Sequence, residues 1–120
     1  MNTLPESFGF LRVSVSGAGY TIPIEGALVY VYSDEEGTRR LLYSLVTNGD
    51  GLTDTVTLPT PPLADSFDEN GKTKPYADYM LLVRKDGYRP QDSRTVPVFP
   101  GITSLQRVSL IPSDGGGNER

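Results

Sequence analysis

Apolar and polar residues alternate one by one in short segments along most of this sequence. In the first segment Leu11, Val13 and Val15 share one face, and polar residues stand between them. A period of two is typical of β-strands, because successive side chains of a strand point to opposite faces. No stretch carries a helical period of 3.6 residues over enough length to predict a helix. The alternation therefore predicts an all-β fold.

Turn-forming residues divide the chain into about seven strands. They are expected near residues 11–16, 27–32, 40–47, 54–58, 79–85, 94–99 and 104–111. The segment NGDG at residues 48–51 is the strongest hairpin signal, because Asn and Gly tolerate the positive φ angles of tight hairpins. Pro97 predicts that the sixth strand is an edge strand, since proline cannot donate to a ladder. Seven short strands without cysteine predict an antiparallel β-sandwich.

The domain is expected to span residues 10–112, and a chain of 120 residues is long enough to bury its own core. Residues 1–9 are assigned to an N-terminal segment, and residues 113–120 to a flexible, Gly-rich tail. A loop with four prolines and no periodicity runs from residue 59 to residue 75. Loops of that length are usually functional or mobile.

Composition excludes several kinds of function. The chain has no histidine and no cysteine, which removes the usual general base near neutral pH, thiolate nucleophiles and the commonest zinc ligands. Its net charge is −4 and it has no basic stripe, so we expect no nucleic-acid partner. No apolar run reaches membrane-spanning length, and the first residues lack the pattern of a signal peptide. We expect a protein that is cytoplasmic as synthesised, without a membrane partner.

Several segments resemble motifs of carboxypeptidase regulatory-like domains, which are transthyretin-like β-sandwiches. They are PIEGALVYV at 23–31, TNGDGL at 47–52, YMLLV at 79–83 and GY at 87–88. A closer set is similar to modules of spore cortex-lytic proteins from anaerobic spore-forming bacteria. That set comprises LPTPP at 58–62, PYA at 75–77, GYRP at 87–90, VPVF at 96–99, GITSLQ at 101–106 and LIP at 110–112. The resemblance implies a cell-wall or spore-envelope setting, and it transfers no catalytic residue.

Neither catalysis nor a cofactor is expected. The lysines Lys72, Lys74 and Lys85 lie in predicted loops or beside a turn, which disfavours the desolvated lysine of a Ser-Lys dyad. A carboxylate-dependent hydrolase has acidic residues available, although acidic turns are usually only solvated. These residues are Asp34, Glu35, Glu36, Asp65, Asp68 and Glu69.

No metal site and no internal crosslink are predicted. The turn at residues 48–54 alternates oxygen-bearing side chains toward a glycine, as calcium loops do. In an EF-type loop, however, the first ligand would fall on Val46 and the last near Thr57, and neither has a carboxylate. Some sandwiches form a lysine–asparagine bond from an early strand, but Arg12 stands on that strand here and is no substitute for lysine.

Two features are candidate binding sites. Tyr30 and Tyr32 lie on the outward face of the second strand and, with Tyr43 on a neighbouring strand, would form an aromatic platform for a sugar or a protein. The alternative is cross-strand pairing that only stabilises the sheet. Phe67, in the long loop, is the second candidate, as an exposed anchor in an acidic setting. Its alternative is a mobile loop.

Together these observations predict a non-catalytic binding or protein-interaction module associated with the bacterial cell wall or spore envelope. Its partner would be peptidoglycan or another protein. One alternative is a structural assembly component, such as a decoration or baseplate protein of a phage-like particle. A hydrolase that uses two carboxylates is a second and disfavoured alternative.

Overall fold

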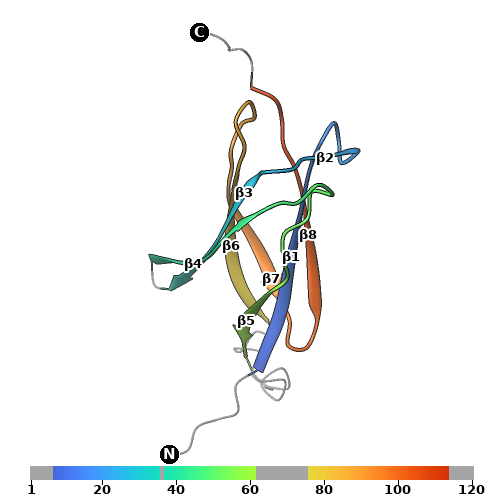
Figure 1. Cartoon of the computed structure of the whole chain (residues 1–120). Coiled ribbons are helices and arrows are strands. Elements are labelled where there is room, and N and C mark those ends of the chain that lie inside the picture. The colour runs from blue at the N-terminus through green and yellow to red at the C-terminus, as the bar shows by residue number, and fades with distance from the viewer. Residues whose placement is uncertain (1–6, 36, 62–75, 114–120) are drawn as a thin grey trace, which may run out of the picture.

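The computed structural model describes residues 7–35, 37–61 and 76–113, and all regular structure in them is β-strand. The strands are β1 (Ser7–Gly17), β2 (Ile22–Pro23), β3 (Leu28–Glu35), β4 (Thr38–Val46), β5 (Val56–Thr60), β6 (Ala77–Arg84), β7 (Gln91–Val98) and β8 (Thr103–Ser109) (Figure 1). None of the described segments is a helix with the length and apolar character needed to cross a membrane.

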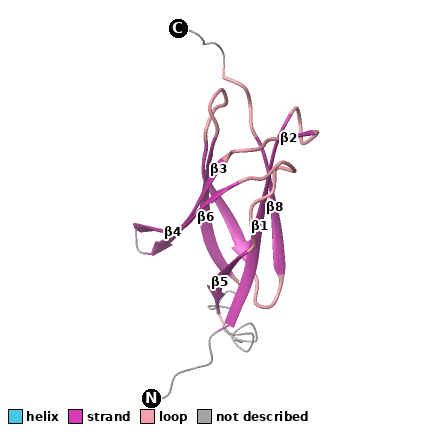
Figure 2. Cartoon of the chain, in the orientation of Figure 1, coloured by secondary structure: helices cyan, strands magenta, loops and turns pink. Residues whose placement is uncertain are grey.

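Two four-stranded sheets pack face to face (Figure 2). In the first, which we call sheet A, β1 is central. One edge of β1 pairs with β8, and the other pairs with β5 and then with β2. The second, sheet B, has the order β4-β3-β6-β7. The predicted β-sandwich is confirmed, with two additions: the β1–β8 pair is parallel, and β2 is too short to show a period.

The core lies between the sheets and is made of the inward-facing residues of each strand. The largest fully buried side chains are Leu11, Leu58, Leu81, Leu110, Val13, Val15, Val29, Val31, Val83, Val96, Val98 and Val108. Each such side chain stabilises the fold by about 1.5–3 kcal/mol relative to an exposed position. Because the residues expected inside β1 and β3 are among them, the predicted faces of these strands are confirmed.

The predicted hairpin at Asn48 is wrong, because β4 belongs to sheet B and β5 belongs to sheet A. The turn chemistry itself is present: Asn48 Oδ1 accepts hydrogen bonds from the N–H groups of Asp50 (2.9 Å) and Leu52 (3.1 Å). Val15 of β1 donates its N–H to the Gly51 carbonyl at 2.7 Å. The segment therefore follows the edge of β1 while it crosses between the sheets, and its flanking strands do not pair.

The two prolines near strand ends behave differently from each other. Pro97 lies in β7, an edge strand of sheet B, as predicted. Pro59 does not stop its strand, because β5 continues to Thr60. Since β5 pairs only with β1 within the described residues, the missing N–H of Pro59 can face the unpaired side.

At the N-terminal end, β1 begins at Ser7, ahead of the predicted boundary at residue 10.

Candidate functional site

Tyr30 and Tyr32 lie on the outer face of sheet B, as the alternation in β3 predicts. Their neighbours Val29 and Val31 point into the core and have no exposed surface. Both tyrosine rings are half-buried. Because β3 lies between β4 and β6, residues of two neighbouring strands flank each ring.

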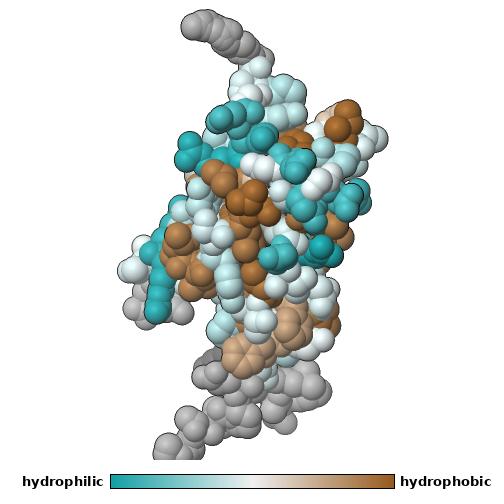
Figure 3. Space-filling view, viewed as in Figure 1, coloured by the Kyte–Doolittle hydropathy of each residue, from teal (hydrophilic) through white to brown (hydrophobic). Residues whose placement is uncertain are grey.

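Three successive cross-strand rows make up the central part of this face. The rows are Val46, Leu28 and Arg84; Ser44, Tyr30 and Leu82; and Leu41, Tyr32, Met80 and Thr95. We call these residues the outer-B face. Leu28, Leu41 and Val46 are 38%, 51% and 58% exposed, and hydrophobic side chains are visible at the surface over β4 (Figure 3).

The composition of the outer-B face differs from that of an ordinary solvated sheet. An antiparallel sheet with one buried face usually presents polar residues on the other. Here the central positions are aliphatic residues, methionine or tyrosine, and Arg84 is the one charged residue of the set. Tyrosine, methionine and arginine are enriched at protein interfaces, whereas lysine, glutamate and aspartate are depleted there. The face thus has the composition of a contact surface.

Tyr43 does not join the two tyrosines, which corrects the predicted platform. It is the cross-strand partner of Val31 and therefore shares the inner side of sheet B. Its hydroxyl donates a 2.8 Å hydrogen bond to the Thr57 carbonyl of β5, across the gap between the sheets. The ring packs against the core. Tyr43 therefore fastens the β4 edge of sheet B to sheet A.

A register shift in the β3–β4 pair explains why the sequence suggested another arrangement. The pairing moves from Val31↔Tyr43 to Tyr32↔Leu41, so Leu42 is left over. Leu41 consequently faces outward while Leu42 packs against the core. The signal for this irregularity is the doublet Leu41-Leu42, which breaks the alternation of β4. Leu28, Leu41 and Val46 are exposed apolar residues of the outer-B face that the sequence pattern did not single out.

Phe67, the second predicted anchor, lies outside the described residues.

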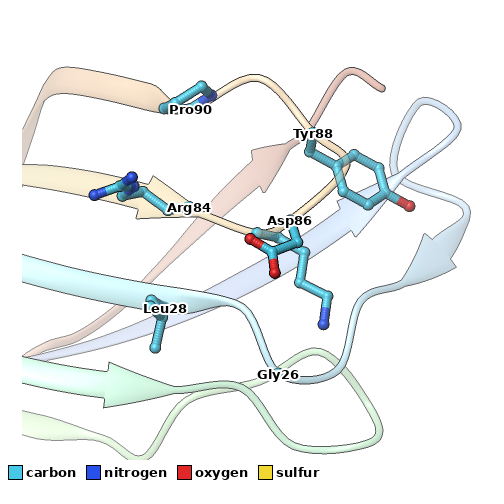
Figure 4. A pocket seen from close by; sticks show the side chains of 7 residues that line it. Gly26, Leu28, Arg84, Asp86, Tyr88 and Pro90 are labelled. Atoms are coloured by element: carbon cyan, nitrogen blue, oxygen red, sulfur yellow. The ribbon is translucent and has the colours of Figure 1, made fainter. Parts of the chain in front are cut away.

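A shallow pocket of about 400 Å³ borders the outer-B face at the β6–β7 turn. Its lining comprises Gly26, Leu28, Arg84, Lys85, Asp86, Tyr88 and Pro90. Arg84 and Tyr88 point to opposite sides of it (Figure 4). The pocket shares Leu28 and Arg84 with the outer-B face and therefore extends it.

Within the ranges that the structure describes, no group of three or more His, Cys, Asp or Glu residues is placed to hold a metal ion. The turn at residues 48–54 is held by its own backbone and by the Asn48 side chain. Asp50 and Asp54 are both exposed there.

No protein-family profile matches this sequence, and no curated protein sequence matches it. Solved structures do resemble its fold. The Bacillus anthracis TIE protein has 17% identity and a TM-score of 0.57, with 88% of this chain and 17% of that chain covered. GBS52, the minor pilin of Streptococcus agalactiae, has 16% identity and a TM-score of 0.61, with 96% and 49% covered.

An enzyme shares the same architecture. Chlorocatechol 1,2-dioxygenase from Pseudomonas putida has 15% identity and a TM-score of 0.54, with 95% of this chain and 63% of that chain covered. The chain thus spans less than two thirds of each of these three proteins. At such identities the likeness shows a common β-sandwich fold, which a minor pilin and a dioxygenase both contain.

Proposed function

We propose that this chain is a non-catalytic protein-interaction module of the bacterial cell surface, and that it binds its partner through the outer-B face. The observation that carries the proposal is the aliphatic and aromatic composition of three consecutive outward rows in sheet B. Large apolar patches on the surface of a domain mark contact sites, because burying them on a partner removes them from water.

The chemistry of the face favours a protein over a glycan. Sugar rings stack on aromatic side chains, but a sugar site also needs convergent polar groups that fix the hydroxyls. Ser44, Thr95 and Arg84 are the polar members of the face, and Ser44 and Arg84 lie in different rows. Leu41 and Val46 present aliphatic surface that suits a hydrophobic partner. The two tyrosines are the feature that keeps peptidoglycan as the second candidate.

The proposal also includes a location at the cell surface and a role without catalysis. Two of the proteins with a similar fold are a minor pilin and the TIE protein, which supports a surface module. The motifs shared with carboxypeptidase regulatory-like and spore cortex-lytic modules support a wall or spore-envelope location. Non-catalytic action is supported by a sequence without histidine or cysteine.

Site-specific photocrosslinking tests the proposed face. A photoreactive phenylalanine analogue replaces Leu41 on the outer-B face or, as the matched control, Leu105 on the outer side of sheet A. The two leucines are 51% and 55% exposed. We expect Leu41 to yield a discrete crosslinked protein on the cells that produce this chain, and Leu105 to yield none. Products of equal yield at both positions, or none at Leu41, would overturn the proposal.

Co-sedimentation with purified peptidoglycan separates the two candidate partners. The experiment compares the wild-type protein with the Tyr30→Ala, Tyr32→Ala double variant. We expect no saturable binding of either. Saturable binding that the double variant loses would replace the protein partner by a glycan on the same face.

A further inference from the structure

The described part of the chain enters the sandwich through β1 and leaves it through β8, and these two strands are direct neighbours. They pair in parallel over seven residue pairs, from Phe10↔Thr103 to Ser16↔Ser109. Because both strands run in the same direction, the start of β1 and the end of β8 lie at opposite ends of the pair (Figure 1). A force that pulls these two points apart therefore acts along the strands.

The hydrogen bonds of the pair lie across that direction. At one end Phe10 donates its N–H to the Ile102 carbonyl at 3.0 Å, and at the other end Leu110 donates its N–H to the Ser16 carbonyl at 2.8 Å. In a parallel ladder the bonds between these ends are evenly spaced. Pulling along the strands loads all of these bonds at the same time. Pulling the strands apart sideways would break them one after another.

The surroundings of β1 prevent the strand from sliding alone. Its other edge is bonded to β5, to the turn that contains Gly51, and to β2. Val13 and Val15 of β1 and Val108 of β8 have no exposed surface. Sliding β1 past β8 would therefore pull buried side chains out of close-packed positions, which adds resistance to that of the hydrogen bonds.

The exit of the chain is also bonded to the opposite sheet. Arg89 donates its N–H to the Ile111 carbonyl at 2.8 Å, and Ser113 donates its N–H to the Gly87 carbonyl at 2.9 Å. Tyr88 and Pro112 form an isolated β-bridge between these contacts. The β6–β7 turn thus holds the segment after β8, and this segment must detach before force reaches the β1–β8 pair in full.

We propose that the sandwich carries tensile force along β1 and β8, with their parallel pair as the mechanical clamp. This role goes beyond partner binding, because it concerns how the domain resists force and not what it binds. Such force arises in any surface protein that is anchored at one point and held by a partner at another. Forced unfolding is governed by the unfolding rate and not by equilibrium stability. The direction of loading changes this rate, because it decides whether the hydrogen bonds of the pair break together or one after another.

Single-molecule force spectroscopy tests the clamp by changing only the direction of pulling. Since the chain has no cysteine, introduced cysteines provide unique attachment points. Handles at Ser7→Cys and Ser113→Cys shear the β1–β8 pair. Handles at Ser7→Cys and Thr103→Cys pull from the same end of the pair and peel it open.

We expect the unfolding force to be several-fold higher in the shearing geometry, because seven residue pairs then share the load. Peeling loads them one at a time. Equal unfolding forces in the two geometries would overturn the proposal. The two arms share Ser7→Cys and differ only in the position of the second handle, and thermal unfolding of both double variants checks that their stabilities are equal.

Two proline variants of β8 locate the resistance. The Leu110 N–H bonds to β1, and backbone groups alternate between the two edges of a strand, so even-numbered residues of β8 direct their N–H groups at β1. Gln106→Pro removes such a group, whereas Leu105→Pro removes one on the opposite edge. We expect Gln106→Pro to lower the shearing force strongly and Leu105→Pro to preserve most of it. Thermal unfolding checks that both variants fold, and equal losses of force in two folded variants would contradict the clamp.

Discussion

The two faces of sheet B are built by the same strands but follow opposite rules. On β6, Leu81 is 1% exposed in the core, whereas the next residue, Leu82, lies on the outer-B face. On β3, Val31 and Tyr32 stand in the same relation. The inner residues are apolar because the core requires it. Folding makes no such demand on the outer residues, since an antiparallel sheet is stable with a solvated polar face.

Apolar residues on the two faces therefore have two different origins. Removing inner residues should damage the fold, and removing outer residues should damage only the proposed partner binding. Pairs of variants that compare a buried position with a nearby exposed one test this distinction.

The largest effect is expected from the adjacent leucines of β6. Leu81→Ala leaves a cavity between the sheets and should lower the free energy of unfolding by about 2–5 kcal/mol. Leu82→Ala removes surface that is already partly in water, so its loss should stay below about 1 kcal/mol. Urea unfolding of the two variants measures both values. Similar losses would mean that the outer face also stabilises the fold and would break the distinction.

A smaller effect is expected from two glycines of one turn. Gly51 has φ = 77°, and a Cβ there would lie 2.5 Å from the Val15 carbonyl oxygen, so Gly51→Ala should destabilise the fold by about 3 kcal/mol. A Cβ at Gly49 would meet no atom within 4 Å, and Gly49→Ala should change stability by less than about 0.5 kcal/mol. Thermal unfolding monitored by circular dichroism compares them. A tolerated Gly51→Ala would contradict the close contact with β1.

Substitution of two buried threonines by valine should change stability in different ways. Thr47 Oγ1 donates to the Ile24 carbonyl at 2.7 Å and accepts from the Ala27 N–H at 2.9 Å, so Thr47→Val should cost about 2 kcal/mol by leaving both groups unpaired. Thr60 Oγ1 is buried and has no hydrogen-bond partner in the described part of the chain. Thr60→Val should therefore be neutral or slightly stabilising. Guanidinium titrations provide the test, and a large loss at Thr60 would reveal an additional partner.

The smallest effect concerns an exposed contact on the outer side of sheet A. The Arg107 guanidinium carbon lies 5.0 Å from the centre of the Tyr20 ring. An exposed cation–π pair of this kind contributes about 0.5–1 kcal/mol. We expect a double-mutant cycle of Arg107→Gln and Tyr20→Ala to show a coupling in that range. No coupling would mean that the outer side of sheet A contributes nothing to stability through this pair.

Much of the fold follows from the alternation of residue types, while the candidate site follows only in part. The outward placement of Tyr30 and Tyr32 is predicted correctly because β3 alternates without interruption. Tyr43 is misplaced because the extra residue Leu42 shifts the register in β4. A shift of one residue reverses the face of every side chain beyond it. Phe67 lies outside the residues that the structure describes.

Local features of the sequence are enough to predict the short strands, the core-facing residues of β1 and β3, and the position of β7 at a sheet edge. These properties are local, because they depend on side-chain period and on the missing N–H of proline. Two further features depend on the folded chain as a whole: the turn at Asn48 joins two sheets, and β1 pairs in parallel with β8. Such pairings join residues far apart in the chain, and the packing of the whole core selects them.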